Sequence, residues 1–327
     1  MPVPSPNLYP PFNTIRLSHV CLNVADLAVS KAFYVDTLGL QVTDETQQHV
    51  YLRAMEERGH HCVILQKSDT PGTVEVMGFK TFDEEDLDKA KVFFESKGRP
   101  TYWVERPYQG RTLLTSDNMG IPLEFYHKMD RLPPIHQTYA LYKGVKPLRI
   151  DHFNCFSPDV DASVAFYASF GFRVTEYTED EDSKRLWAAW MHRKGGVHDM
   201  AFTNGTGPRM HHLAFWVPTP LNIIDLLDLM ATTGYVSNIE RGPGRHGISN
   251  AFFLYVLDPD GHRIEIYCSD YQTVDPDLEP IKWDLKDPQR QTLWGAPAPQ
   301  SWFEHGTSFV DVDLQESGLK ATPIVAP

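Results

Sequence analysis

The alternation of apolar and polar residues along this chain predicts strands and helices that recur in the same order. Residues 18–42 read SHVCLNVADLAVSKAFYVDTLGLQV, and residues 151–174 read DHFNCFSPDVDASVAFYASFGFRV. Each stretch predicts a strand, an acidic turn, an amphipathic helix and a glycine stop, because acidic residues suit a helix N-cap and glycines suit the position after its end. The positions that match, each at an offset of 133 residues, are His19 and His152, Asp26 and Asp159, and Phe33-Tyr34 and Phe166-Tyr167.

A second pair of segments repeats further along each half. Residues 116–126 read SDNMGIPLEFY and residues 257–267 read LDPDGHRIEIY, at an offset of 141 residues. Both predict a tight turn followed by a strand, and each strand carries a glutamate, Glu124 or Glu265, that we expect to point inward.

Helices predicted over residues 83–98 and 219–234 precede these second segments. Four units, each a strand, a helix and several strands, therefore begin near residues 15, 73, 148 and 208. We predict an α+β fold of four βαβββ modules paired into two similar domains.

Composition and charge narrow the classes of function. The 327 residues are 42% hydrophobic and 22% charged, as in ordinary globular proteins. A formal net charge of -13 at pH 7 argues against a nucleic-acid partner. No apolar run approaches the roughly 20 residues of a membrane span, and the first residues lack the basic and apolar regions of a signal peptide. The four cysteines form no CxxC pair, so we expect reduced thiols in a cytoplasmic protein without a membrane partner.

Residues 242–247, GPGRHG, match the GxGxxG pattern of dinucleotide-binding loops. That pattern needs a helix to open at the loop, whereas the following ISNAFFLYVLD predicts a strand and Pro243 stiffens the loop. We therefore expect a turn that leads into this strand and no phosphate site.

Three side chains at repeat-related positions predict a metal centre in the second half. His152, His212 and Glu265 each come from a strand facing a shared cavity, and two histidines with one carboxylate can bind one face of Fe(II) or Mn(II). His211 competes with His212, but strand side chains alternate, so we expect only one of the two to point inward, and the register favours His212.

The first half offers His19 and Glu124 at the matching places. Its third place falls near Val76, which cannot bind a metal. The expected division of the chain is an N-terminal extension (1–13), an N-terminal domain without metal (14–129), a linker (130–147), a C-terminal metal-binding catalytic domain (148–270) and a tail that covers the active site (271–327).

The sequence resembles the type I extradiol ring-cleaving dioxygenases of the vicinal oxygen chelate superfamily over nearly its whole length. The resemblance is densest in AAWMHRKGGVHDMAF, GPRMHHLAFWV, ERGPGRHGISNAFFLYVLDPDGHRIEIY and DPQRQTLWG. It implies an enzyme of aromatic catabolism that opens a catechol ring with O2 beside its two hydroxyls. It also implies Fe(II) as the cofactor, with Mn(II) as the alternative, and a homotetramer.

The same resemblance assigns roles around the metal. His198 matches an acid–base histidine, which suits an imidazole because its pKa lies near working pH. Tyr255 matches a tyrosine that hydrogen-bonds the bound ring oxygen. The complete set that the resemblance implies is catalytic His198, Tyr255 and Asn154, substrate-binding Arg241, His246, Trp190 and Arg290, and metal-binding His152, His212 and Glu265.

One position departs from the resembling enzymes. They carry a second arginine after Arg290, and this chain carries Gln291. The substrate is then either 3,4-dihydroxyphenylacetate, with its carboxylate held by Arg241 and His246, or a neutral or differently substituted catechol. Two further hypotheses are an isomerase or lyase on the same fold and a non-catalytic protein that binds small aromatic molecules.

Overall fold

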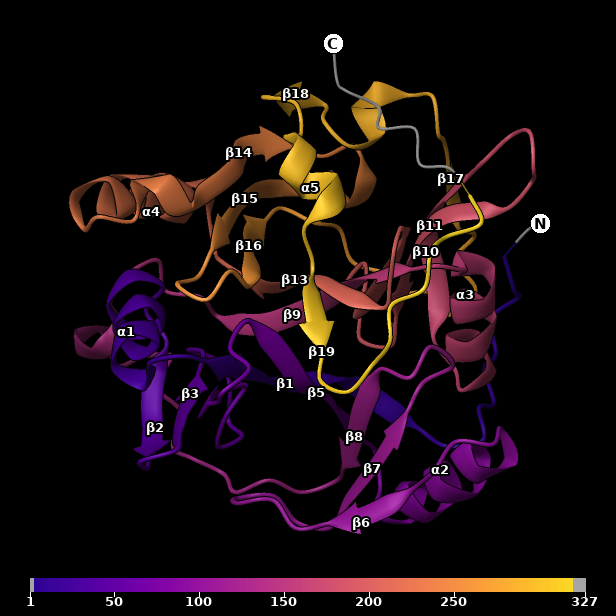
Figure 1. Ribbon diagram of the computed structural model, residues 1–327, viewed down its shortest axis with the longest axis horizontal. Helices are drawn as coiled ribbons and strands as arrows, with labels where there is room; N and C mark the ends of the chain where they lie inside the picture. Colours follow the sequence, from indigo (N-terminus) through magenta and orange to yellow (C-terminus); the bar gives the residue numbers. More distant parts are fainter. Residues whose placement is uncertain (1–2, 320–327) are drawn as a thin grey trace.

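The computed structural model describes residues 3–319 and shows two similar halves, one stacked on the other (Figure 1). Residues 320–327, the end of the expected tail, lie outside the described residues. The elements of the first half are β1 (Thr14–Val24), α1 (Leu27–Ala32), η1 (Phe33–Thr37), β2 (Gln41–Glu45), β3 (His49–Arg53), β4 (Val63–Lys67), β5 (Thr73–Thr81), α2 (Glu85–Ser96), β6 (Tyr102–Val104), β7 (Thr112–Ser116) and β8 (Pro122–Tyr126).

A connection with one short 3-10 turn, η2 (Tyr139–Leu141), leads into the second half. Its elements are β9 (Arg149–Ser157), α3 (Val160–Ser169), β10 (Arg173–Glu179), β11 (Leu186–His192), β12 (Met200–Asn204), β13 (Arg209–Trp216), α4 (Pro220–Thr232), η3 (Val236–Asn238), β14 (Ile239–Arg245), η4 (Ile248–Asn250), β15 (Phe252–Leu257) and β16 (Arg263–Cys268). The remaining elements are β17 (Ile281–Asp284), η5 (Pro288–Arg290), β18 (Trp294–Gly295), α5 (Gln300–Glu304) and β19 (Thr307–Phe309).

Both halves have the same strand order. The first sheet runs β2-β3-β4-β1-β5-β8-β7-β6, and the second runs β10-β11-β12-β9-β13-β16-β15-β14. In each half two βαβββ modules meet at a central antiparallel pair, β1–β5 or β9–β13. The predicted α+β fold of four modules is therefore confirmed.

The repeated caps also form as expected. Asp26 and Asp159 accept hydrogen bonds from the first backbone N–H groups of α1 and α3. Gly39 and Gly171, after these helices, have φ of 91° and 99°, which glycine adopts without strain. Among residues 3–319, no helix combines the length and apolar character needed to cross a membrane.

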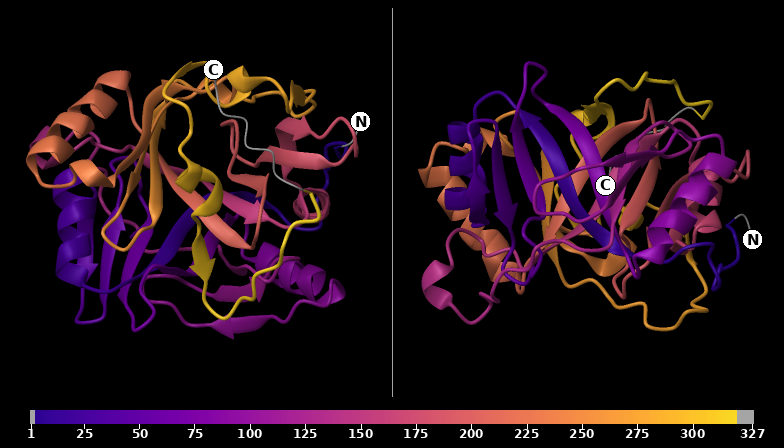
Figure 2. Two further views of the ribbon diagram at one scale, coloured as in Figure 1. Left: turned by 45° about the horizontal axis from the view of Figure 1, so that its top comes forward. Right: turned by 90° about the horizontal axis from the view of Figure 1, so that it is seen from below.

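The two halves are joined by reciprocal hydrogen bonds between repeated residues. Tyr34 Oη donates to Asp258 Oδ2 at 3.0 Å, and Tyr167 Oη donates to Asp117 Oδ2 at 3.2 Å. Each bond connects a helical segment of one half, η1 or α3, to the turn before β16 or β8 of the other half. In Figure 1 this brings α1 beneath α4 and α3 above α2, and Figure 2 shows the same pairing from two further sides.

The tail also connects the halves. Its strand β19 pairs antiparallel with β13 and parallel with β5, so it joins one central strand of each half. In Figure 1 and in the left view of Figure 2 the yellow α5–β19 segment runs in front of the sheets.

The turn predicted at residues 242–247, GPGRHG, is wrong in its position, because the chain turns later. Residues up to Arg245 belong to the irregular strand β14, and the chain reverses afterwards through η4, so that β15 begins only at Phe252. Gly242 has a φ of 103°, and a Cβ there would lie 2.9 Å from the Phe253 carbonyl oxygen. The glycines therefore allow close, bulged pairing with β15.

The interface between the halves makes stability depend on pH through Asp117. This carboxylate is fully buried and accepts from Met119 N, Ile121 N and Tyr167 Oη, yet burial outweighs these bonds and raises its pKa to about 6. The folded protein therefore holds this proton more tightly than the unfolded chain does. The stabilisation is complete below about pH 4 and is lost as pH rises through about 6.

We expect Asp117→Asn to remove this pH dependence. Between about pH 4 and pH 6.5 the wild type should lose about 2 kcal/mol of unfolding free energy relative to the variant, from a shift of about two pKa units. Chemical denaturation of both proteins at several pH values, with EDTA present, measures the difference. Unfolding free energies of wild type and variant that change in parallel across this pH range would contradict the role of Asp117.

Candidate metal centre and active site

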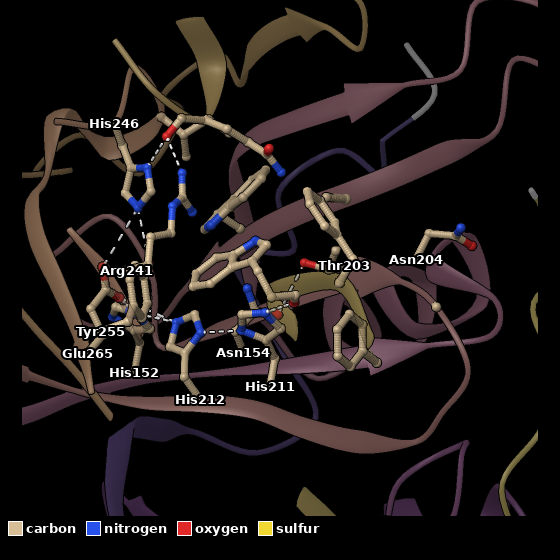
Figure 3. A pocket seen from close by; sticks show the side chains of 18 of the residues that line it. His152, Asn154, Thr203, Asn204, His211, His212, Arg241, His246, Tyr255 and Glu265 are labelled. Carbon is tan, nitrogen blue, oxygen red and sulfur yellow. Dashed lines mark hydrogen bonds and ion pairs between the residues drawn. The ribbon is translucent and has the colours of Figure 1, made fainter. Parts of the chain in front are cut away.

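Three neighbouring strands bring the expected metal ligands together. His152 lies on β9, His212 on β13 and Glu265 on β16, and Ala214 of β13 pairs with both His152 and Glu265. His152 Nε2 lies 3.2 Å from His212 Nε2 and 2.9 Å from Glu265 Oε2, and His212 Nε2 lies 3.3 Å from that oxygen. All three side chains are buried, and Figure 3 shows them converging on one point.

These distances fit one face of an octahedral metal ion. Three mutually perpendicular bonds of about 2.1 Å place their ligand atoms about 3.0 Å apart. His152 Nδ1 lies 3.1 Å from Asp151 Oδ2, which can only accept, so Nδ1 carries the proton and Nε2 presents a lone pair. Lone pairs that converge at 3 Å in a buried site repel one another unless a proton or a metal ion lies between them, and hydrogen bonds to Asp151 and Glu265 raise the pKa of His152 against the effect of burial. The donor set therefore fits Fe(II) or Mn(II).

Two β-bulges shape this site. Along β9 and β13, Ala214 pairs with His152 and Phe215 with Ile150, which leaves Asp151 as an extra residue. Met210 pairs with Cys155 and His212 with Asn154, which leaves His211 as an extra residue. A bulge re-aims a side chain that simple alternation would turn away. The expectation that only one of His211 and His212 points inward is therefore wrong, because both line the same pocket.

The first half has the same framework with different chemistry. Val76 pairs with Cys21 as His212 pairs with Asn154, so Val76 stands at the place of His212. His19 Nε2 donates to Glu124 Oε1 at 2.6 Å, and Arg106 Nε donates to Glu124 Oε2 at 2.9 Å. Burial alone would raise the pKa of Glu124, but the hydrogen bond from His19 and the charge of Arg106 lower it to about 2. A guanidinium thus neutralises this buried carboxylate.

A cavity of about 410 Å³ opens beside the three ligands of the second half, within the range of small-molecule sites. Asn154, Trp190 and His198 are among its lining residues. The His198 ring centroid lies 3.8 Å from that of His152, and burial together with this neighbour holds the pKa of His198 well below 6.5. Its Nδ1 is buried without a hydrogen-bond partner among the described residues. His198 is therefore neutral at neutral pH, and one of its ring nitrogens has no protein partner among the described residues.

Tyr255 and His246 form one hydrogen-bonded unit on another wall. His246 Nδ1 donates to the Gln291 carbonyl oxygen, so its Nε2 accepts from Tyr255 Oη at 3.0 Å. Burial and the charge of Arg241 lower the pKa of His246 to about 3, so the ring is neutral at neutral pH. His246 is thus placed to orient Tyr255, and its expected contact with a substrate carboxylate stays a prediction.

Arg241 is the cation of this wall. Its Nη2 donates to the Gln291 carbonyl oxygen at 3.2 Å and to Thr292 Oγ1 at 2.8 Å. Its Nε and Nη1 are buried and have no partner in the part of the chain that the structure describes. Burial lowers the pKa of Arg241 only to about 10, so the group stays charged at neutral pH. A buried charge with two unpaired donors favours an anion in the cavity.

Arg290 also lines the cavity and is 1% exposed. Its Nε donates to the Leu285 carbonyl oxygen, and its guanidinium lies 5.2 Å from the centroid of the Trp187 ring. Burial lowers the pKa of Arg290 to about 10, so this second cation also keeps its charge.

Sequence reasoning missed several residues of the site. Trp302 of α5 packs against Tyr255 with 4.2 Å between ring centroids, and Arg241 lies 4.4 Å from the centre of its indole. The tail has no repeated counterpart, so no internal comparison pointed to Trp302. Asp151 stands directly before a ligand histidine, and that adjacency is the signal that could have identified it.

Comparisons with known proteins agree with this geometry. The chain matches the Glyoxalase/Bleomycin resistance protein/Dioxygenase superfamily over residues 16–125 and 149–266, one match in each half. It is 30% identical over 315 residues to a metapyrocatechase of Geobacillus stearothermophilus, covering 91% of this chain and 95% of the relative. It is also 30% identical over 303 residues to a manganese-dependent 2,3-dihydroxybiphenyl 1,2-dioxygenase of Geobacillus genomosp. 3, covering 86% of this chain and 94% of the relative.

Solved structures resemble the whole chain. Homoprotocatechuate 2,3-dioxygenase from Brevibacterium fuscum, in its anaerobic complex with 3,4-dihydroxyphenylacetate, is 42% identical with a TM-score of 0.90, covering 96% of this chain and 99% of that one. The enzyme of the same name from Arthrobacter globiformis is 40% identical with a TM-score of 0.89, covering 96% of both chains. With its duplicated fold and its two-histidine, one-carboxylate site, the chain belongs to the extradiol ring-cleaving dioxygenases of the Glyoxalase/Bleomycin resistance protein/Dioxygenase superfamily.

Proposed function

We propose that this enzyme cleaves a catechol whose ring carries an anionic side chain, such as 3,4-dihydroxyphenylacetate, next to its two hydroxyls. The observation that carries this proposal is the presence, in one cavity, of the ligand triad and of the buried, partly unpaired guanidinium of Arg241. The triad suits the hydroxyls of a catechol, and Arg241 suits a carboxylate.

His152, His212 and Glu265 would hold the metal and leave its remaining positions to ligands. Bound there, Fe(II) or Mn(II) would supply the Lewis-acid and redox chemistry that joins a catechol to O2. Asp151 fixes the tautomer of His152, while Lys194 Nζ lies 3.5 Å from Asp151 Oδ1 and helps to keep that carboxylate charged.

The other residues of the cavity handle protons and orient the ring. His198 is neutral and unpaired at Nδ1, so it can accept a proton released by a catechol hydroxyl and return it later. Burial and the nearby Glu265 hold the pKa of Tyr255 well above 10, so its hydroxyl stays a hydrogen-bond donor. Asn154 is positioned by Thr203, and Trp190 adds a ring face to the cavity wall.

The cation count favours an anionic substituent despite Gln291. Arg241 and Arg290 both line the cavity and both remain charged. The backbone of Gln291 contributes as well, because its carbonyl oxygen accepts from Arg241 and His246. Losing an arginine at this position removes one charge and leaves the other two in place.

The two alternative functions, an isomerase or lyase and a non-catalytic binding protein, would require different residues around the metal. An isomerase or lyase of this fold would use a fourth protein ligand, and the described residues contribute three side chains to the cluster. A protein that only binds aromatic molecules would not need an unpaired, neutral histidine beside a metal ligand. Both observations favour ring cleavage.

Assembly and location follow the family resemblance. We propose a homotetramer in the cytoplasm. The four cysteines are buried free thiols, which suits a reducing compartment. Light scattering coupled to size-exclusion chromatography tests the tetramer.

We expect Glu265→Gln to lower the affinity for Mn(II) at least 100-fold, because the carboxylate supplies the anionic ligand of the triad. The matched control is Glu124→Gln at the repeat-equivalent position, which should leave metal binding unchanged. Metal content by elemental analysis and titration with Mn(II) measure both. Full metal binding by the Glu265 variant would contradict the assigned centre.

We expect the Fe(II)-loaded enzyme to turn 3,4-dihydroxyphenylacetate yellow in air, as its ring opens, with a kcat/KM well above that for 4-methylcatechol. Arg241→Met should raise KM for the acid about 30-fold or more, because a charge-assisted contact is lost, and change KM for 4-methylcatechol little. Arg245→Met, on the same strand but outside the cavity lining, is the control. Equal losses for both substrates would contradict the carboxylate role of Arg241.

A further inference from the structure

His211, the bulged residue of β13, connects a metal ligand to the C-terminal tail. Its Nδ1 lies 2.6 Å from Nδ1 of His212, and its Nε2 lies 2.9 Å from the carbonyl oxygen of Trp302 in α5. The ring is 2% exposed and is flanked edge-to-face by Phe156 at 4.9 Å and by the Trp302 ring at 4.3 Å. Figure 3 shows His211 beside His212, at the end of the row that begins with His152.

The carbonyl oxygen decides where the protons lie. A carbonyl can only accept, so His211 Nε2 carries a proton, and a neutral imidazole then has a lone pair on Nδ1. That lone pair accepts from His212 Nδ1, which must therefore carry its own proton. His212 Nε2 is left with a lone pair, and this is the atom that faces Glu265 and His152.

The tail segment that carries the Trp302 carbonyl is held in place by a buried arginine, Arg263. Arg263 is 0% exposed, and its Nη1 donates to the carbonyl oxygens of His211 and His305, each at 2.9 Å. Its Nη2 donates to the Ser301 carbonyl oxygen at 3.2 Å. One side chain thus holds the backbone of the bulge and the tail on both sides of Trp302, at Ser301 in α5 and at His305 just after it. A movement of this part of the tail would therefore move the hydrogen-bond acceptor of His211.

We infer that His211 is a positioning residue that passes the proton arrangement set by the Trp302 carbonyl to His212, so that His212 presents its Nε2 lone pair to the metal. This inference rests on the proposed metal centre and extends it to the tail. Asp151 does the same for His152 with a carboxylate. Each ligand histidine is thus oriented by the residue directly before it, which only a β-bulge can bring to the same side of the strand.

A matched pair of variants tests the relay. His211→Asn keeps an oxygen acceptor near the place of Nδ1, whereas His211→Leu has nearly the same shape and no acceptor. Both variants lose the contact with Trp302 equally. We expect Mn(II) to bind to His211→Asn within about threefold of the wild-type affinity, and to His211→Leu 10- to 100-fold more weakly, as for other groups that orient metal ligands.

The measurement is a titration of the metal-stripped proteins with Mn(II), in which the electron paramagnetic resonance signal reports the free ion. Thermal unfolding in EDTA checks that both variants fold, and His211→Phe replaces His211→Leu if the latter does not. Equal weakening in Asn and Leu variants would overturn the inference, because it would show a packing role only. Unchanged affinity in the Leu variant would overturn it as well.

Failure of the proposed function would look different. Wild-type protein that binds Mn(II) through Glu265, but opens no catechol, would reject ring cleavage and leave the relay intact. Ring cleavage with equal Mn(II) affinity in the Asn and Leu variants would reject the relay and leave the proposed function intact.

Discussion

A buried glutamate at the same place in each half is the constraint from which the site follows. Glu124 and Glu265 lie on the equivalent strands β8 and β16, and both are buried. Burying a carboxylate costs free energy unless a positive charge neutralises it. In the first half Arg106 provides that charge, and both Arg106 and His19 donate hydrogen bonds to Glu124. In the second half the side chains that meet Glu265 are two histidines whose lone pairs point at it. A metal ion completes this half as the guanidinium of Arg106 completes the other.

The fold supplies the same geometry to both halves, and the residues at two bulges decide the chemistry. Ser18 and Asp151 are the extra residues of β1 and β9, and each contacts the hydroxyl of a repeated tyrosine, Tyr126 or Tyr267. Glu75 and His211 are the extra residues of β5 and β13. A serine cannot stabilise a ligand histidine as a carboxylate can, and Val76 beside Glu75 offers no ligand. The duplication therefore produces two frames, of which one can hold a metal.

The sequence predicted what repeats, because matching offsets report equivalent places without any knowledge of contacts. The four modules, the helix caps at Asp26 and Asp159 and the three ligand positions all came from that comparison. It could not predict the bulges, since one extra residue in a strand changes which side chains share a face without changing the apolar pattern. Nor could it predict the hydrogen bond between Tyr34 and Asp258, because a comparison of the repeats identifies equivalent positions and not contacts between the two halves.

The tail makes the two halves unequal in function. Trp302 contacts the ring of Tyr255, lies against the guanidinium of Arg241 and accepts a hydrogen bond from His211 at its carbonyl, so one residue outside the repeats contacts all three. Arg263 ties that residue to β13 and β16, and β19 then anchors the tail across both central strands. A displacement of α5 would therefore act on Arg241 and on His211, the neighbour of the metal ligand His212, together. On the proposed function, binding of an anionic catechol beside Arg241 and binding of the metal at His212 are for this reason expected to favour the same position of the tail.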